Sequence, residues 1–419
     1  MAREILDIEP ILDHWRSDLK TEMRTAEDMG TYFSRSKNFD TIERHFILDA
    51  VGWSAFSHNL AMDDRLPYSA TSLSKQPNKT FKLAVLEGNI RFAKTEGGDP
   101  QLWLDKSHGA LRSNCAHPPS FDELKAVFLE QIKWAIDDGA SVIIAGEFAC
   151  PSCDDEAEFE VFLGEIRNLV REAPHPVFVV AGSRHVASDQ GTAQPHNSNI
   201  AMLFGGDPTE ADFEKKLIDQ PIRHYKRAPS ISLGERIFSP VSPELPIYIT
   251  PFSSFGMLVC SDAFDTQIQF SYLRQNMKTA PRAQIIFVPA FNTSDQFYQS
   301  CRYLSYLANA TVIVVNSHPD DFPSSSVKFY TAGIEAGERL NCMKKRPDDF
   351  GNMPDGEKDR IKDATRHLNN SPDIKIGQTS RRVATYNIDR VMLETFSKIL
   401  RKNGGALLRK SFDLSSATM

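Results

Sequence analysis

The stretch that decides the fold is "FGMLVCSDAFD", Phe255–Asp265. Its apolar first half runs into a single thiol, Cys260, and the chain becomes polar at once with Ser261 and Asp262. A short apolar run bounded by a polar turn predicts a buried strand. Alone, a cysteine in such a strand is more often a small core residue than a reactive one. At the end of the strand, however, the thiol is held rigidly where open α/β folds bind ligands.

The composition is that of a folded, water-soluble protein. Hydrophobic residues make up 41% and charged residues 25% of the 419 residues, which are ordinary globular values. The net charge of -7 and the pI near 5.9 provide no overall attraction to nucleic acid or anionic lipid. The basic stretch "KILRKNGGALLRK" near the C-terminus is typical of a solvated helical tail. We therefore expect no nucleic-acid partner and no membrane association.

The chain shows no sign of export. No run approaches the roughly 20 apolar residues that span a bilayer, and "MAREILDIEP" has acidic residues where a signal peptide has its apolar core. Six cysteines in a chain of this length are typical of reduced thiols. These features predict a cytoplasmic protein.

Short β-branched runs alternate with helical patterns from about residue 80 to 318, which predicts a layered α/β domain. The clearest helix follows Ser120, which forms a capping-box pair with Glu123, and ends at Gly139. Further helices are predicted near 155–172 and 297–309. The division that we expect is a helical N-terminal extension (1–62), a linker (63–79), the main domain (80–400) with a polar insertion at about 319–375, and a tail (401–419).

Three predicted strands end in chemically useful side chains. Glu147 follows "SVIIAG", Lys226 lies in "IRHYKRAP", and Cys260 follows "FGMLV". Singly, such a glutamate is most often a turn residue and such a lysine a solvated one. Because strand ends meet at one crevice in an open α/β fold, we expect the carboxylate, the ammonium and the thiol to converge.

The surrounding sequence resembles the nitrilase superfamily of carbon–nitrogen hydrolases over roughly 80–318 and 380–398. "DDGASVIIAGEFACP" is similar to the segment with the catalytic glutamate, "HYKRAPSISLGER" to the lysine segment, and "FGMLVCSDAFD" to the nucleophile segment. The resemblance implies a Cys260–Glu147–Lys226 triad, with Glu235 as a supporting glutamate. It also implies a four-layer α-β-β-α sandwich and a homo-oligomer, a dimer or larger.

The sequence departs from the family pattern around the expected pocket. Glu87 stands where glutamine is common, and Ala263 and Phe264 stand where the family usually has an arginine. The arginine and glutamate that usually precede the position of Asn309 are also missing from "LSYLAN". The departures concern the substrate pocket and local packing more than the triad.

Catalysis by a thiol nucleophile requires these three kinds of group, whatever the family. A thiol with a pKa near 8.5 is mostly protonated at neutral pH, so it needs a base, and Glu147 can accept its proton. Lys226 and the backbone N–H of Ser261 can stabilise the oxyanion. The prediction is hydrolysis of a non-peptide carbon–nitrogen bond in a small molecule through a thioester, without a cofactor. An amide is favoured over a nitrile because amide-cleaving branches of the family are more numerous.

Two other interpretations remain open at this stage. The segments "NCAHPP" and "FACPSC" contain groups for a tetrahedral zinc site, which would be structural or belong to a zinc deaminase, although Pro119 stands where a deaminase has its glutamate. The four candidate zinc ligands are Cys115, His117, Cys150 and Cys153. Alternatively, a protein without catalysis could bind a protein partner through the helices of residues 1–62.

Overall fold

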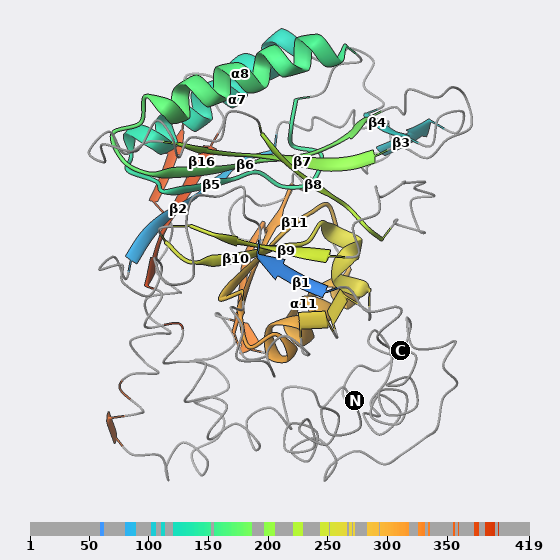
Figure 1. Ribbon diagram of the computed structural model, residues 1–419, viewed down its shortest axis with the longest axis vertical. Coiled ribbons are helices and arrows are strands. Elements are labelled where there is room, and N and C mark those ends of the chain that lie inside the picture. The colour runs from blue at the N-terminus through green and yellow to red at the C-terminus, as the bar shows by residue number, and fades with distance from the viewer. Residues whose placement is uncertain are drawn as a thin grey trace.

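A computed structural model gives the architecture of the chain (Figure 1). The structure describes residues 59–62, 80–88, 102–105, 110–113, 120–151, 155–186, 197–205, 221–228, 244–250, 252–265, 268–269, 271–272, 283–292, 294–317, 326–331, 334–335, 355–356, 359, 373–376, 382–389 and 393.

Two seven-stranded sheets form the body of the domain. Sheet A contains, in spatial order, β1 (Asn59–Met62), β9 (Glu244–Ile249), β10 (Ser254–Met257), β11 (Ile285–Ala290), β12 (Thr311–Asn316), β13 (Val327–Thr331) and β14 (Ile334–Glu335). Sheet B contains β15 (Asp373–Ile376), β16 (Arg382–Asp389), β2 (Thr80–Leu86), β5 (Val142–Ile144), β6 (Val177–Val186), β7 (Asn197–Gly205) and β8 (Ile222–Tyr225). A separate hairpin pairs β3 (Leu102–Asp105) with β4 (Ala110–Ser113).

The centre of each sheet is parallel and its flanks are mainly antiparallel. In sheet B, β2, β5 and β6 run parallel, and in sheet A, β10, β11 and β12 do so. Parallel neighbours end at the same edge of a sheet. The residues that follow β5, β10, β11 and β12 therefore lie at the carboxyl ends of central strands.

Among the described residues, three helices cover the outer faces of the sheets. They are α7 (Phe121–Asp137), α8 (Glu156–Arg171) and α11 (Asp295–Leu307). Figure 1 shows α7 and α8 side by side over sheet B, and α11 on the side of sheet A. The capping box between Ser120 and Glu123 is present, and Asp155 caps α8 by accepting two backbone N–H bonds. These helices confirm the periodicity read from the sequence.

Three apolar clusters hold these layers together. One lies between the two sheets, with Phe178 of β6 and Phe255 of β10 among its members. A second joins sheet B to α7 and α8, and a third joins sheet A to α11. Central strands such as β11 and β12 are buried at every residue because both of their faces are covered. The predicted α/β class with two sheets is confirmed.

Two boundary predictions need correction. Asn59–Met62 were assigned to a helical extension, but they form β1, which pairs in parallel with β9. Residues 327–331 were assigned to a polar insertion, but they form β13, with Val327 and Phe329 in the cluster between the sheets. The polar sequence on both sides of this short strand hides its buried residues from sequence analysis. The predicted helices before residue 59 lie outside the described residues. No described helix is long and apolar enough to cross a membrane.

Candidate active site

Glu147 lies just past β5, and its backbone is held from both sheets. Ser183 of β6 accepts a hydrogen bond from the backbone N–H of Phe148 at 3.0 Å. Ser317, which follows β12 in sheet A, donates its hydroxyl to the backbone oxygen of Glu147. A Cβ on Gly146 would come within 2.7 Å of the backbone nitrogen of Ser317, so only glycine permits this approach. The carboxylate therefore starts from a fixed backbone.

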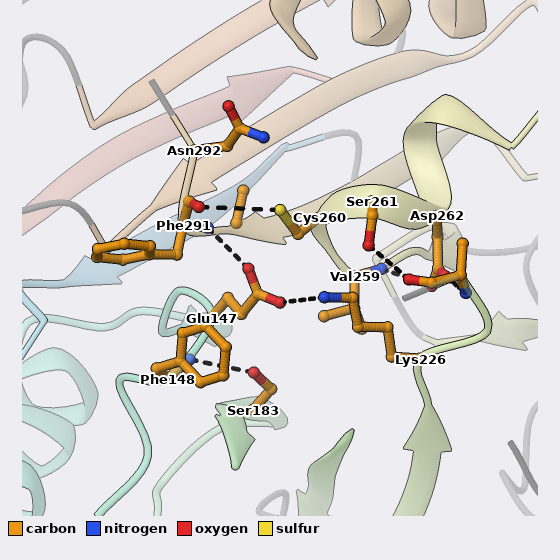
Figure 2. A network of polar contacts seen from close by, with 12 residues as sticks. Glu147, Phe148, Ser183, Lys226, Val259, Cys260, Ser261, Asp262, Phe291 and Asn292 are labelled. Atoms are coloured by element: carbon orange, nitrogen blue, oxygen red, sulfur yellow. Dashed lines mark hydrogen bonds and ion pairs between the residues drawn. The ribbon is translucent and has the colours of Figure 1, made fainter. Parts of the chain in front are cut away.

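Both carboxylate oxygens of Glu147 have partners (Figure 2). Lys226 Nζ donates to Oε1 at 2.8 Å, and the backbone N–H of Phe291 donates to Oε2 at 2.9 Å. The side chains of Glu147 and Lys226 are each only 1% exposed. A buried charge of either sign is costly unless it is paired and hydrogen-bonded, and this pair meets both conditions. Lys226 reaches the site from the end of β8, as the sequence predicted.

Cys260 is the first residue of the short helix η3 (Cys260–Phe264). Its φ of 44° lies in the left-handed region, which a side chain with a Cβ adopts only when its surroundings impose it. Cys260 is 3% exposed, and Sγ lies 4.0 Å from the backbone oxygen of Phe291. Sequence analysis placed the thiol at the end of a strand, and β10 ends three residues earlier, at Met257.

The surroundings keep this thiol neutral at rest. Burial raises the pKa of Cys260 well above its ordinary value, and the charge of Glu147 raises it further. Lys226 acts in the opposite direction but does not compensate. The thiol therefore needs a base at the moment it reacts, and the group whose charge it feels most is the carboxylate of Glu147.

Phe291 is a site residue that the sequence did not reveal. Its backbone N–H donates to Glu147 and its backbone oxygen lies next to Cys260 Sγ, so the backbone of one residue contacts both groups. Its ring and that of Phe148 are 6.0 Å apart in an edge-on arrangement, and both side chains are half-buried. Phe148 has a φ of 59°, which is rare for an aromatic residue. These two rings form an apolar pair at the residues that directly follow Glu147 and β11.

The remaining predicted site residues have different outcomes. Ser261 is beside Cys260, and its hydroxyl donates to the backbone oxygen of Ala228. Glu235 lies outside the described residues, as do three of the four suggested zinc ligands, Cys115, His117 and Cys153. Cys150 is buried in the cluster under α7 and α8. Within the described part of the chain no three His, Cys, Asp or Glu side chains form a metal-binding group, so the zinc site remains a prediction.

Comparison with known proteins gives matches only among solved structures. No family model and no curated protein sequence matches the chain. An amidase from Nesterenkonia sp. superimposes with a TM-score of 0.41 at 10% identity, over 78% of this chain and 98% of the amidase. A variant described as an amidase of the nitrilase superfamily, from Nesterenkonia AN1, gives a TM-score of 0.41 at 10% identity, over 80% and 99% of the two chains.

A third similar structure is another variant of the Nesterenkonia sp. AN1 amidase, in which the acetamide moiety of fluoroacetamide is added covalently at the active-site cysteine. It gives a TM-score of 0.41 at 11% identity, over 80% of this chain and 98% of the amidase. The superfamily named for these neighbours is the one that the sequence motifs resemble.

Proposed function

We propose that this chain is a thiol hydrolase of the nitrilase type that cleaves a non-peptide carbon–nitrogen bond in a small amide. One observation carries the proposal: Glu147 is held by Lys226 at 2.8 Å and by the Phe291 N–H at 2.9 Å, next to a buried thiol that feels its charge. A carboxylate fixed in this way is a base for the thiol, and the ammonium beside it is a partner for developing negative charge.

The first half of the reaction forms a thioester. Cys260 Sγ attacks the carbonyl carbon of the amide while Glu147 takes the thiol proton. The carbonyl oxygen becomes an oxyanion, which Lys226 and the backbone N–H of Ser261 stabilise. When the carbonyl re-forms, the carbon–nitrogen bond breaks, and Glu147 gives its proton to the leaving nitrogen. Ammonia or an amine departs and the acyl group remains on sulfur.

The second half regenerates the enzyme. Water attacks the thioester carbon and gives a proton to Glu147, the oxyanion forms again, and the carbon–sulfur bond breaks. The thiolate takes the proton back from Glu147 and the acid product leaves. One carboxylate therefore serves as base, acid, base and acid in turn. Glu235, outside the described residues, is proposed to position Lys226 or the substrate.

We infer that the paired rings of Phe148 and Phe291 line the acyl pocket and favour an uncharged acyl group. Aromatic rings bury apolar surface well, whereas an unpaired charge beside them would lose its hydration without compensation. We therefore propose small neutral amides as the substrate class, ahead of charged amides; the preference for amides over nitriles comes from the family resemblance of the sequence.

The test measures ammonia and acid release from matched pairs of neutral amides and nitriles, such as propionamide with propionitrile and phenylacetamide with phenylacetonitrile. We expect turnover of amides, and a loss in kcat of about 10²- to 10⁴-fold for Glu147→Gln because the base is gone. Cys260→Ser should lose at least as much. The matched control is Cys301→Ala, which alters another buried thiol, in α11, and should keep its activity. Wild-type turnover by Cys260→Ser would exclude the thioester mechanism.

A further inference from the structure

The side chain of Asp262 is buried in the turn after Cys260 and makes contacts that the reaction above does not use. It is 0% exposed, and its carboxylate accepts three backbone N–H bonds. Oδ1 accepts from Arg227 at 2.8 Å and from Ala228 at 2.7 Å, and Oδ2 accepts from Val259 at 3.0 Å. These donors come from two separate segments of the chain.

The first two donors are the peptides that directly follow Lys226. That segment leaves β8 in sheet B, whereas Asp262 belongs to the turn that leaves β10 in sheet A. The neighbouring residue Ser261 adds a bond between the same segments, because its hydroxyl donates to the backbone oxygen of Ala228. The lysine segment and the thiol turn are therefore joined directly, next to the two residues whose side chains meet at Glu147.

The third donor lies on the other side of Cys260. Val259 donates to the carboxylate of Asp262, while the backbone N–H of Asp262 donates to the oxygen of Val259 at 3.0 Å. Cys260, with its left-handed backbone, is enclosed between the two ends of this reciprocal pair. A strained backbone of this kind persists only where its surroundings fix it, and Asp262 provides that support.

A neutral side chain of similar shape cannot make all of these bonds. An asparagine has one acceptor oxygen and one NH₂ group, so at least one of the three N–H donors would face another donor. Burial raises the pKa of Asp262 to about 6, and the three N–H bonds and the charge of Lys226 limit that rise. The carboxylate is thus kept in the core at a cost.

We propose that Asp262 is a positioning residue, whose carboxylate fixes the distance between the Lys226 ammonium and the Cys260 thiol by bonding both of their segments. This proposal rests on the proposed function, because it assigns Asp262 to the same reaction. Asp262 acts through Lys226 and does not touch the substrate.

The test uses 2-iodoacetamide as a probe and requires no substrate. Alkylation of Cys260 is followed against pH by peptide mass spectrometry in the full chain, with Cys301 as the internal reference, because burial alone raises the pKa of that thiol. Loss of a nearby opposite charge raises a thiol pKa by about 1 to 3 pH units, so Lys226→Met should move the midpoint of the labelling profile upward by that amount. Asp262→Asn should move it in the same direction.

The decisive result comes from the double variant. If Asp262 acts through Lys226, adding Asp262→Asn to Lys226→Met moves the midpoint no further than Lys226→Met alone. The control for a general loss of stability is Asp155→Ala, which removes the cap of α8 and destabilises that helix. It should lower the thermal midpoint without moving the labelling profile.

Other outcomes would overturn either the positioning role of Asp262 or the proposed function. An unchanged midpoint in Asp262→Asn, or equal shifts with and without Lys226, would overturn the positioning role. Wild-type Cys260 that labels no faster than Cys301 would instead overturn the proposed function. If Asp262→Asn does not fold, Ser261→Ala replaces it, because this variant removes one bond between the same two segments and keeps the backbone N–H. A smaller shift in the same direction is then expected, and no shift counts against the proposal.

Discussion

The ion pair between Lys226 and Glu147 makes a quantitative prediction about stability. Each side chain is 1% exposed, and their charged atoms are 2.8 Å apart. Lys226→Met keeps most of the apolar stem but removes the ammonium, so the carboxylate would remain buried with the Phe291 N–H as its remaining bond in Figure 2. Breaking a buried pair by removing one partner costs about 3 to 5 kcal/mol. Glu147→Gln should cost a similar amount, because it leaves the ammonium buried.

The double variant should lose much less free energy of unfolding than the sum of the losses in the two single variants. With both charges gone, a methionine faces a glutamine, and no isolated charge remains in the core. Residues in direct contact show interaction energies of about 0.5 to 3 kcal/mol, and this pair should lie at the upper end. Urea unfolding at 25 °C of the wild type, both single variants and the double variant gives the interaction energy directly.

A second ion pair in the same chain provides the control. Lys82 Nζ lies 3.2 Å from Asp138 Oδ2, but these side chains are 27% and 17% exposed. Partly exposed pairs are worth about 0.2 to 1 kcal/mol, so the cycle of Lys82→Met with Asp138→Asn should give a much smaller interaction energy. If the effects of Lys226→Met and Glu147→Gln add within about 0.5 kcal/mol, the buried pair does not have the coupling that we infer.

Two further predictions concern stability. Gly146→Ala should destabilise the protein by about 1 to 3 kcal/mol and abolish turnover, because its Cβ would meet the backbone of Ser317 at 2.7 Å. The control is Gly164→Ala on α8, where the added Cβ would lie 4.0 Å from Arg167 Nη2; it should stabilise the protein by up to about 1 kcal/mol. Thermal melting compares the two variants. The pKa of Asp262 is raised from 3.8 to about 6 in the folded protein, so protonation of this carboxyl stabilises the fold. Its contribution to the free energy of unfolding is complete below pH 3.8 and is lost as the pH rises through about 6. The free energy of unfolding of the wild type relative to Asp262→Asn should therefore increase by up to about 3 kcal/mol from pH 7 to pH 4, and a flat difference would contradict this.

The sequence revealed the elements and side chains that periodicity and charge make visible. The capped helix after Ser120 and the apolar strands were predicted correctly, because both leave a visible pattern of side chains in the sequence. The order of the motifs led to Glu147, Lys226 and Cys260, and the structure brings these three together. Their roles in catalysis stay part of the proposal.

The sequence did not reveal groups that act through the backbone or through distant pairing. The N–H of Phe291 holds Glu147, yet every residue except proline has such a donor, so no residue type signals the role. Asp262 was noted for its place after Cys260, but its bonds to the segment of Lys226 depend on how the two sheets pack. Strand β13 was missed because its five residues lie within a polar stretch.

The pairing of β16 with β2 has a consequence for how the chain is made. β2 lies between β5 and β16 in sheet B, and its partner residues in β16 come about 300 residues later. At a synthesis rate of about 5 to 20 residues per second, one edge of β2 stays open for roughly 15 to 60 s. Glu147, Lys226 and Cys260 have all left the ribosome by then. The nascent chain thus carries its reactive residues while an apolar strand edge is still available for pairing with other chains.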